Sequence, residues 1–274
     1  MIKFKGINWY PYHGILLPKI PPHQEVVLSQ NEQTELLKKS KAYLLRWTSD
    51  WDGDESEFWY IVKDDFKGMG ELSGNTRNQI RKAQKYCTVK KVTYQEIANN
   101  GYESYKCAFD SYNTDLKPVS KELFYDNMMK SNNYDFFAVY KKDDAEMIAY
   151  SSNTINNDVC SYTTIKLHPK YLKLYSGYIL FYEMNKYYLD DKKFKYIHDG
   201  ARSISHDTNI HTFLVQKFKF RKVYCRLHIA YRNDIALFVK FLYPFKTLIS
   251  KLNFSIANKI TVLLKQEEIR RSFE

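Results

Sequence analysis

The stretch that decides the fold, residues 159–223, reads VCSYTTIKLHPKYLKLYSGYILFYEMNKYYLDDKKFKYIHDGARSISHDTNIHTFLVQKFKFRKV. Its first apolar segment is rich in Tyr, Thr and Ile, as strands are, whereas a later one has the spacing of an amphipathic helix. The expected elements are strands at Cys160–Leu167, Lys195–Asp199 and Arg221–Ala230 and helices at Tyr178–Leu189 and Thr208–Lys217. Strands that alternate with helices over such short connections predict a βαβαβ unit.

The preceding residues predict the sheet that supports this unit. Segments Tyr134–Lys141 and Glu146–Thr154 alternate apolar and polar residues, and short turns join them to each other and to the strand that follows. We therefore expect three consecutive antiparallel strands. The other elements expected upstream are a strand at Thr88–Thr93, a helix over Tyr94–Tyr112 interrupted near Asn99–Gly101, and a helix at Lys121–Lys130 capped by Ser120.

The first part of the chain predicts a smaller set of elements. A leader rich in Pro and aromatic residues precedes a helix expected around Gln30–Lys41. Two apolar runs follow, Ala42–Thr48 and Glu57–Lys63, and the segment SDWDGDES (49–56) joins them. Because Asp-Gly favours a tight turn, we expect the two runs to form a β-hairpin.

The charge balance points to anionic partners. The 274 residues carry 42 Lys and Arg against 31 Asp and Glu, a formal net charge of +11. This excess favours nucleotides, phosphates, tRNA or an acidic membrane surface, although a lysine-biased soluble protein has the same balance. Ser73 or Asn75 can cap a helix, and basic residues recur on one face of it at Arg77, Arg81 and Lys85, with Lys82 beside them. That face is either solvated or in contact with phosphates.

Cysteine and histidine usage excludes several classes of site. The four cysteines, Cys87, Cys107, Cys160 and Cys225, are widely separated and form no CxxC pair, which favours a reducing, cytoplasmic compartment. The N-terminal sequence lacks the apolar core of a signal peptide, and no run reaches the ~20 apolar residues of a membrane-spanning helix. The seven histidines have no metal-ligand spacing, so we expect no metal site. No P-loop or dinucleotide fingerprint is present.

Three stretches resemble the GNAT superfamily of acyltransferases, specifically its FemAB-like branch associated with cell-wall and surface-polysaccharide genes. Residues 72–92, LSGNTRNQIRKAQKYCTVKKV, are similar to the basic helix and strand that open such domains. Residues 164–184, TIKLHPKYLKLYSGYILFYEM, look like the strand, loop and helix that bind the donor's pyrophosphate. Residues 207–225, DTNIHTFLVQKFKFRKVYC, resemble the closing helix and strand.

The resemblance covers residues 40–231 and implies a fold class. This class is α/β (α+β), with a GNAT-like mixed, mostly antiparallel sheet flanked by helices. The division that we expect has three parts. They are an N-terminal extension over 1–87 that holds a partial GNAT-like half, a GNAT-like domain over 88–231, and an amphipathic helical tail over 232–274.

The resemblance also implies where the donor binds. In such domains the strand before the loop splays from its parallel neighbour, here 159–167 from 195–199, and frees backbone N–H groups for the donor's carbonyl and oxyanion. The loop then holds pyrophosphate at a helix N-terminus, where Lys170 and Lys173 add positive charge. The donor-binding residues implied are Ile165, Leu167, Lys173, Ser176, Gly177, Tyr178 and Asn209.

Candidate catalytic residues lie in a polar loop, HDGARSISHDTN (198–209), at the carboxyl end of the second splayed strand. Attack by an amine on an acyl donor needs a base, and the leaving group needs a proton. Asp199 or His206 is the candidate base, and Arg202 is the candidate for binding an acidic acceptor or a phosphate. The alternative is that Asp199-Gly200 forms a turn, Asp207 or Thr208 caps the next helix, and the histidines face solvent.

The sequence departs from the family pattern in the loop and in the closing helix. Gly177 is the one glycine of the donor loop, Lys219 replaces the glycine before Phe220, and Val215 or Gln216 stands where a tyrosine acid is common. Three functions stay open. They are acyl-CoA-dependent transfer to an amine or hydroxyl of a cell-envelope or surface-polysaccharide precursor, FemAB-like transfer from aminoacyl-tRNA, and a non-catalytic binding or scaffold module at the membrane.

The C-terminal residues predict a basic amphipathic segment. Apolar residues keep a helical period, interrupted at Pro244, at Leu237, Phe238, Phe241, Leu242, Phe245, Leu248, Ile249 and Leu252. We expect peripheral contact with an anionic membrane through residues 236–264, while docking onto the chain itself or a homodimer is equally consistent. The expected location is the cytoplasm, free or at the inner face of the membrane. The expected partners are a small-molecule or lipid-linked acceptor and tRNA.

Overall fold

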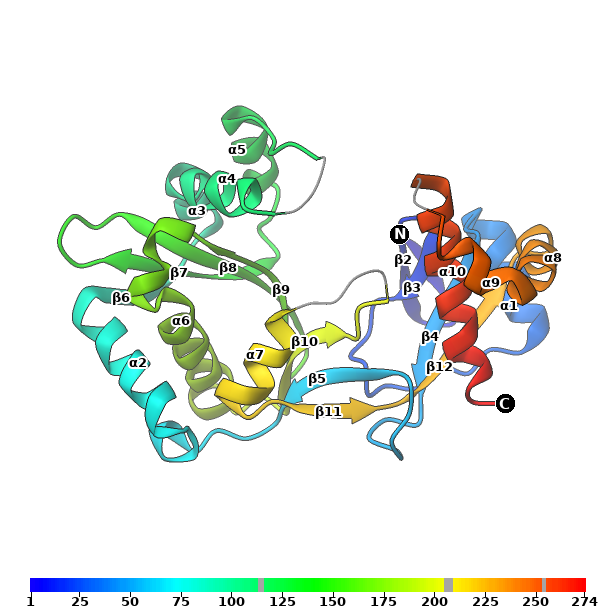
Figure 1. Ribbon diagram of the computed structural model, residues 1–274, viewed down its shortest axis with the longest axis horizontal. Coiled ribbons are helices and arrows are strands. Elements are labelled where there is room, and N and C mark those ends of the chain that lie inside the picture. The colour runs from blue at the N-terminus through cyan, green and yellow to red at the C-terminus, as the bar shows by residue number, and fades with distance from the viewer. Residues whose placement is uncertain (113–115, 205–208, 253–254) are drawn as a thin grey trace. The chain divides into compact units, whose positions relative to one another are not determined.

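The computed structural model describes residues 1–112, 116–204, 209–252 and 255–274, which contain two sheets (Figure 1). The chain separates into two compact units. One unit, which we call the smaller-sheet unit, consists of residues 1–60, 201–208 and 222–274. The other, the larger-sheet unit, consists of residues 61–200 and 209–221. The three-part division at 87/88 and 231/232 stays a prediction.

Seven strands form the larger sheet, in the order β11-β5-β10-β9-β8-β7-β6. Their bounds are β5 Trp59–Lys63, β6 Cys87–Val92, β7 Tyr134–Lys141, β8 Met147–Asn156, β9 Val159–Leu167, β10 Tyr196–Ala201 and β11 Arg221–Tyr224. Neighbouring strands from β6 to β9 pair antiparallel, and β9 pairs with β10 in parallel. The expected mixed, mostly antiparallel sheet and its run of three consecutive strands are confirmed.

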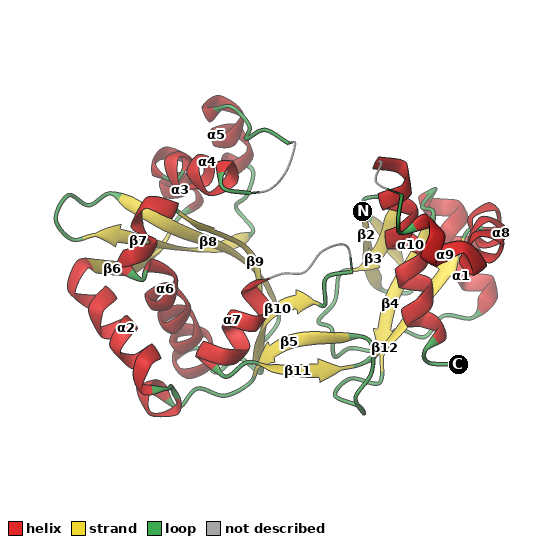
Figure 2. Ribbon diagram, viewed as in Figure 1, coloured by secondary structure: helices red, strands yellow, loops and turns green. Residues whose placement is uncertain are grey.

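Helices cover both faces of this sheet (Figure 2). The helices on one face are α2 (Gly74–Tyr86), α6 (Ser176–Asn185) and α7 (Asn209–Phe218), and those on the other face are α3 (Tyr94–Asn100), α4 (Tyr102–Asp110) and α5 (Lys121–Met129). Ser73, Thr93 and Ser120 cap α2, α3 and α5, because each side chain accepts a backbone N–H of the first turn. A short 3₁₀ helix, η1 (Gly68–Glu71), precedes α2, and a π-helix, η3 (Lys186–Asp191), extends α6. The interruption expected near Gly101 separates α3 from α4.

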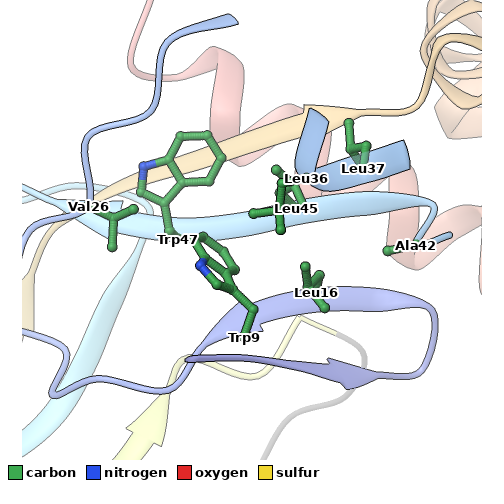
Figure 3. Packing of buried hydrophobic residues seen from close by; sticks show 8 residues of the cluster. All are labelled: Trp9, Leu16, Val26, Leu36, Leu37, Ala42, Leu45 and Trp47. Carbon is green, nitrogen blue, oxygen red and sulfur yellow. The ribbon is translucent and has the colours of Figure 1, made fainter. Parts of the chain in front are cut away.

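The smaller sheet has the order β1-β2-β3-β4-β12. Its bounds are β1 Ile2–Phe4, β2 Ile7–Tyr12, β3 Ile15–Pro18, β4 Leu44–Ser49 and β12 Arg226–Tyr231. Side chains alternate along β4. Leu45 and Trp47 join a buried cluster with Trp9, Leu16 and residues of α1 (Gln30–Ser40), as Figure 3 shows. The intervening Arg46 binds Gln266 Oε1 at 3.0 Å, on α10 (Ser255–Arg271).

Two expectations about strands are wrong. The hairpin expected from Ala42–Thr48 and Glu57–Lys63 does not form, because β4 pairs with β3 and β12 while β5 lies between β11 and β10. The connecting loop does not fold back on itself, since the Gly53 N–H donates to the Tyr224 carbonyl at 3.2 Å. The single strand expected at Arg221–Ala230 is divided at Cys225 into β11 and β12, which belong to different sheets.

The N-terminal leader holds strands that the sequence reading missed. Gly6 and Gly14 have φ of 77° and 80°, values that favour glycine, and they make the turns between β1, β2 and β3. A Cβ on Gly14 would lie 2.5 Å from Cδ2 of Tyr43, so only a glycine fits beside this ring. The aromatic leader is therefore an integral part of the smaller sheet.

Candidate active site

The site begins where two parallel strands part. Within β9 and β10, only three residues are in register, with Tyr196, Ile197 and His198 opposite Val159, Cys160 and Ser161. β9 then continues along β8 as far as Leu167. Within the described residues, the other edge of β9 has no registered strand partner beyond Ser161, so backbone N–H and C=O groups there can bind a ligand. The splay implied by the resemblance is present.

A β-bulge interrupts β9 near the same place. Ser152 pairs with Thr164 and Asn153 pairs with Tyr162, so Thr163 is the extra residue of β9. A bulge bends its strand and increases the local twist. The bend therefore accompanies the separation of β9 from its parallel neighbour.

The segment after β9 forms a closed turn. A 3₁₀ helix, η2 (Pro169–Leu174), leads through Tyr175, with φ of 59°, into α6, whose first residues Ser176 and Gly177 are buried. A Cβ on Gly177 would lie 3.1 Å from Leu167 Cδ1, so this glycine lets α6 approach the end of β9. Within the described residues, the fully buried hydroxyl of Ser176 has no hydrogen-bond partner. The N-terminus of α6 thus packs against Leu167 at the end of β9.

The other donor-binding candidates lie around this turn. Tyr178 is the third residue of α6, because the helix begins at Ser176, and its ring lies 5.8 Å from that of Tyr175. Lys173 is exposed on η2, and Asn209 is exposed as the first residue of α7. Ile165 is half-buried on β9. Ile165 therefore lies on β9, Lys173 and Tyr178 lie in the segment that follows it, and Asn209 begins α7.

A basic surface lies beside the turn. α2 packs against α6 and η2, and Lys82 Nζ of α2 lies 5.9 Å from the centroid of the Tyr175 ring. Lys82, Lys170 and Lys173 are exposed, and we call them the α2–η2 surface. Its positive charge suits a ligand rich in phosphates.

A carboxylate and an imidazole meet at the carboxyl end of β10. His211 Nε2 of α7 lies 3.4 Å from Asp199 Oδ2 and 3.1 Å from the Asp199 carbonyl oxygen. A carbonyl oxygen can only accept, so Nε2 of His211 carries the hydrogen. The side chains are 9% exposed for His211 and 11% for Asp199. Burial raises the pKa of the Asp199 carboxyl, and the hydrogen bond from His211 lowers it in part.

The other candidates at this strand end are placed differently. His198 is buried and accepts the Gly200 N–H through Nδ1 at 3.1 Å, and burial lowers its pKa to about 4. Arg202 belongs to the smaller-sheet unit, where its Nη1 lies 2.7 Å from Glu57 Oε2. His206 lies outside the described residues. Of the predicted catalytic residues, Asp199 is therefore the one that pairs with an imidazole at the end of β10.

His211 is the residue that sequence reasoning missed. It shares the buried face of α7 with Leu214 and Phe218, at the i, i+3, i+7 spacing of a helix. The sequence held a signal for this residue. His211 lies in the first turn of the helix that follows the strand-end loop, and it shares a helical face with two core residues.

The pair has the properties of a proton acceptor. A raised pKa brings a carboxylate closer to the operating pH, where general bases work best. The imidazole Nε2–H, which faces Asp199, orients the carboxylate. With the free edge of β9, the pair supplies what acyl transfer needs, which is a group to receive a proton and donors for an oxyanion.

Comparison with known proteins places the fold. The sequence matches no known family, and no curated protein matches it. Among solved structures, the chain is similar to the C-terminal domain (DUF2156) of a proposed lysylphosphatidylglycerol synthetase from Agrobacterium fabrum, with a TM-score of 0.54 and 11% identity over 85% of this chain and 83% of that one. It is also similar to FemX, with a TM-score of 0.52 and 10% identity over 83% and 84% of the two chains. The chain shares the fold of these two proteins, which is the GNAT-like fold that the sequence resemblance implied.

Proposed function

We propose that this protein transfers an aminoacyl group from aminoacyl-tRNA to an amine or hydroxyl of a cell-envelope precursor. The observation that carries the proposal is the Asp199–His211 pair at the end of β10, the strand from which β9 splays. The acceptor's amine or hydroxyl attacks the carbonyl carbon of the aminoacyl ester, and its proton passes to the pair. The free edge of β9 stabilises the oxyanion, after which the ester bond to the tRNA breaks and the ribose oxygen takes a proton.

The closed turn favours tRNA over coenzyme A as the carrier of the acyl group. The ordinary GNAT loop holds a diphosphate close to its backbone, whereas Ser176 and Gly177 are buried against Leu167 in this chain. The exposed lysines of the α2–η2 surface suit a longer polyanion that needs no such close approach. The name of one structural neighbour refers to a lysyl group on phosphatidylglycerol, so we include lipid acceptors.

A transfer assay with two donors tests this function. Purified protein would be mixed with a labelled aminoacyl-tRNA or with labelled acetyl-CoA and with extracted envelope precursors, and labelled product would be measured. We expect product with aminoacyl-tRNA as the donor and none with acetyl-CoA, and we expect aminoacyl-tRNA to raise the melting temperature of the protein. If product forms with acetyl-CoA and not with aminoacyl-tRNA, the proposal is wrong and acyl-CoA-dependent transfer is supported instead.

A second experiment separates catalysis from scaffolding. If the chain is a non-catalytic module at the membrane, Asp199→Asn and His211→Gln leave its cellular function intact. Loss of function with both variants, while each protein stays folded by circular dichroism, supports an enzyme. Retention of function with both contradicts the catalytic role of the pair.

A further inference from the structure

We propose that the helical segment 233–252 docks on an anionic lipid bilayer through its outer face. The segment comprises α8 (Asn233–Leu242), a 3₁₀ turn η4 (Tyr243–Phe245), α9 (Lys246–Ile249) and the three residues after it. This inference does not rest on the proposed transfer reaction. It concerns a surface of the smaller-sheet unit for which the described residues offer no protein cover.

The outer face is apolar to an unusual degree. We define the apolar stripe as Leu237, Phe241, Phe245, Leu248 and Leu252, which recur every three or four residues. Their side chains are 70%, 70%, 47%, 64% and 48% exposed, in that order. Isolated exposed leucines are normal on a soluble protein, but a continuous stripe of large apolar side chains marks an interaction site.

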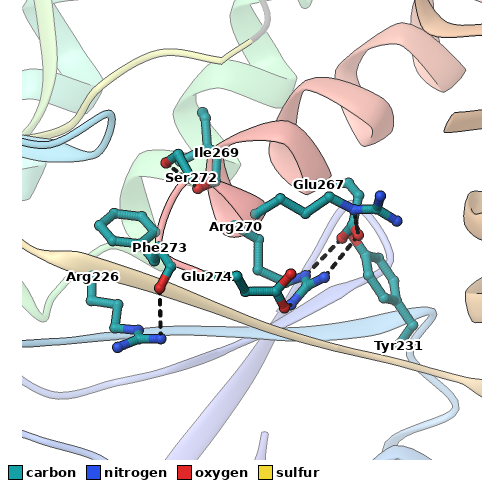
Figure 4. Close-up of polar contacts among 9 residues, drawn as sticks. Arg226, Tyr231, Glu267, Ile269, Arg270, Ser272, Phe273 and Glu274 are labelled. Atoms are coloured by element: carbon teal, nitrogen blue, oxygen red, sulfur yellow. Dashed lines mark hydrogen bonds and ion pairs between the residues drawn. The ribbon is translucent and has the colours of Figure 1, made fainter. Parts of the chain in front are cut away.

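The opposite face of the segment is already occupied. Val239 of α8 is buried, and α8 packs against β12 and α10. The C-terminal part of α10 is fixed in turn by Glu267, whose buried carboxylate binds Arg270 at 2.8 Å, Arg271 at 2.7 Å and the Tyr231 hydroxyl at 3.0 Å (Figure 4). The segment is therefore anchored to its own unit through its inner face. The apolar stripe is left for another partner.

The charge around the apolar stripe selects an anionic partner. From Leu237 to Leu264 the sequence has four lysines and no acidic residue. Lys240 and Lys251 are exposed, and in the described part of the chain neither has a carboxylate partner. The nearest acidic residue before the apolar stripe, Asp234, is bound by Arg232 at 2.7 Å. An apolar face bordered by unpaired lysines is the composition of helices that lie in the interface of an anionic bilayer.

The same composition argues against the other occupants. A two-fold dimer through this face would bring like charges together, and the cores of protein interfaces are depleted in lysine. Among the described helices, none is long and apolar enough to cross a membrane. The apolar stripe is therefore suited to shallow insertion beside acidic headgroups, with the lysines among the phosphates.

Vesicle co-sedimentation tests the inference. We would compare vesicles of phosphatidylglycerol and phosphatidylcholine with vesicles of phosphatidylcholine alone. The full-length protein is expected to bind the anionic vesicles and to lose binding as salt increases. Leu237→Gln, Phe241→Gln and Leu248→Gln together should lower the affinity at least tenfold. Lys240→Gln and Lys251→Gln together should lower it about fivefold per lysine on anionic vesicles.

The matched control replaces apolar side chains that are equally exposed elsewhere. Val27 is 79% exposed and Leu123 is 48% exposed, and neither belongs to the segment. Val27→Gln with Leu123→Gln should leave vesicle binding unchanged. Equal loss in this control, or wild-type binding by the triple glutamine variant, overturns the inference. So does failure of the wild type to bind anionic vesicles, in particular if light scattering shows that the triple variant dissociates a dimer.

Discussion

At the scale of single residues, the proposed catalytic role of Asp199 conflicts with its contribution to the stability of the fold. Burial raises the pKa of its carboxyl, so folding makes the ionised form less favourable than it is in the unfolded chain. The ionised form that can act as a base is the one that burial disfavours. Active sites commonly hold such a destabilised group, and its replacement by a neutral analogue often stabilises the protein.

This conflict predicts the behaviour of Asp199→Asn. The amide is neutral and still offers an oxygen to His211, so we expect a higher melting temperature than wild type at pH 7. The advantage should shrink as the pH falls, because the wild-type carboxyl then becomes protonated as well. The transfer rate should fall about a hundredfold or more. Thermal unfolding at several pH values and a single-turnover assay check both parts, and a variant less stable than wild type at pH 7 contradicts the assignment.

His198 predicts a separate pH dependence of stability. Its pKa is about 4 in the folded protein, below the ordinary value of 6.5, because the buried ring loses its hydration. A depressed pKa contributes stability that is complete above pH ~6.5 and is lost as the pH falls toward 4. The loss is about 3 kcal/mol.

The variant His198→Asn isolates this contribution. Its side-chain oxygen can accept the Gly200 N–H in place of Nδ1, but it cannot take up a proton. Urea unfolding of both proteins between pH 7 and pH 4 should show a smaller loss of stability for the variant. Parallel losses in the two proteins would mean that other groups govern acid unfolding.

At the scale of elements, local patterns were sufficient for most of the larger unit but not for the pairing of distant strands. Alternation predicted β7, β8 and β9, and capping residues predicted α2 and α5, since these signals lie within a few residues. The hairpin of β4 and β5 failed because Asp-Gly permits a turn but does not require one. Which strand lies beside β5 is decided by β10 and β11, far along the chain.

The candidate site was predictable to the same extent. Asp199 was proposed because strand ends collect reacting groups, whereas its contact with His211 depends on how α7 packs on the sheet. Because the donor loop has Gly177 as its one glycine, the sequence indicated that this loop differs from the family pattern. Its closure by Leu167 could not be read from the sequence, because it depends on the distance between β9 and α6.

An ion pair within the larger unit gives a prediction for β5. Lys63 at the end of β5 is 1% exposed, and its Nζ lies 2.9 Å from Oε2 of Glu71, which is 9% exposed in η1. Loss of one member of a buried pair leaves a charge without compensation, at a cost of about 3 kcal/mol. Lys63→Met should therefore destabilise the protein by that amount. Lys63→Met with Glu71→Leu should recover most of the loss, because no buried charge remains.

Denaturant unfolding of the two variants measures this difference. Glu71→Gln should destabilise the protein less than Lys63→Met does, because Lys63 keeps an ion pair with Asp65 at 3.6 Å. A double variant that is as unstable as Lys63→Met would show that packing at Lys63, and not its charge, holds β5 in place.

At the scale of the whole molecule, two chemically different surfaces lie on two units. The larger-sheet unit carries the splayed strands, Asp199, His211 and the α2–η2 surface. The smaller-sheet unit carries the apolar stripe. The formal charge of +11 is thus used in two ways in our proposals, to bind a polyanionic donor and to dock at acidic lipid.

The donor-binding role of the α2–η2 surface predicts how salt affects tRNA affinity. Each phosphate neutralised by a lysine releases condensed counterions, so the logarithm of the affinity falls linearly with the logarithm of salt concentration. Lys82→Gln with Lys173→Gln should weaken tRNA binding and reduce the steepness of that line by about 1 to 2. Lys121→Gln with Lys130→Gln removes the same charge from the exposed surface at α5 and should leave the slope nearly unchanged. Titration with fluorescent aminoacyl-tRNA between about 50 and 200 mM salt measures both slopes. Equal reductions in the two double variants would mean that the net charge, and not the α2–η2 surface, attracts the tRNA.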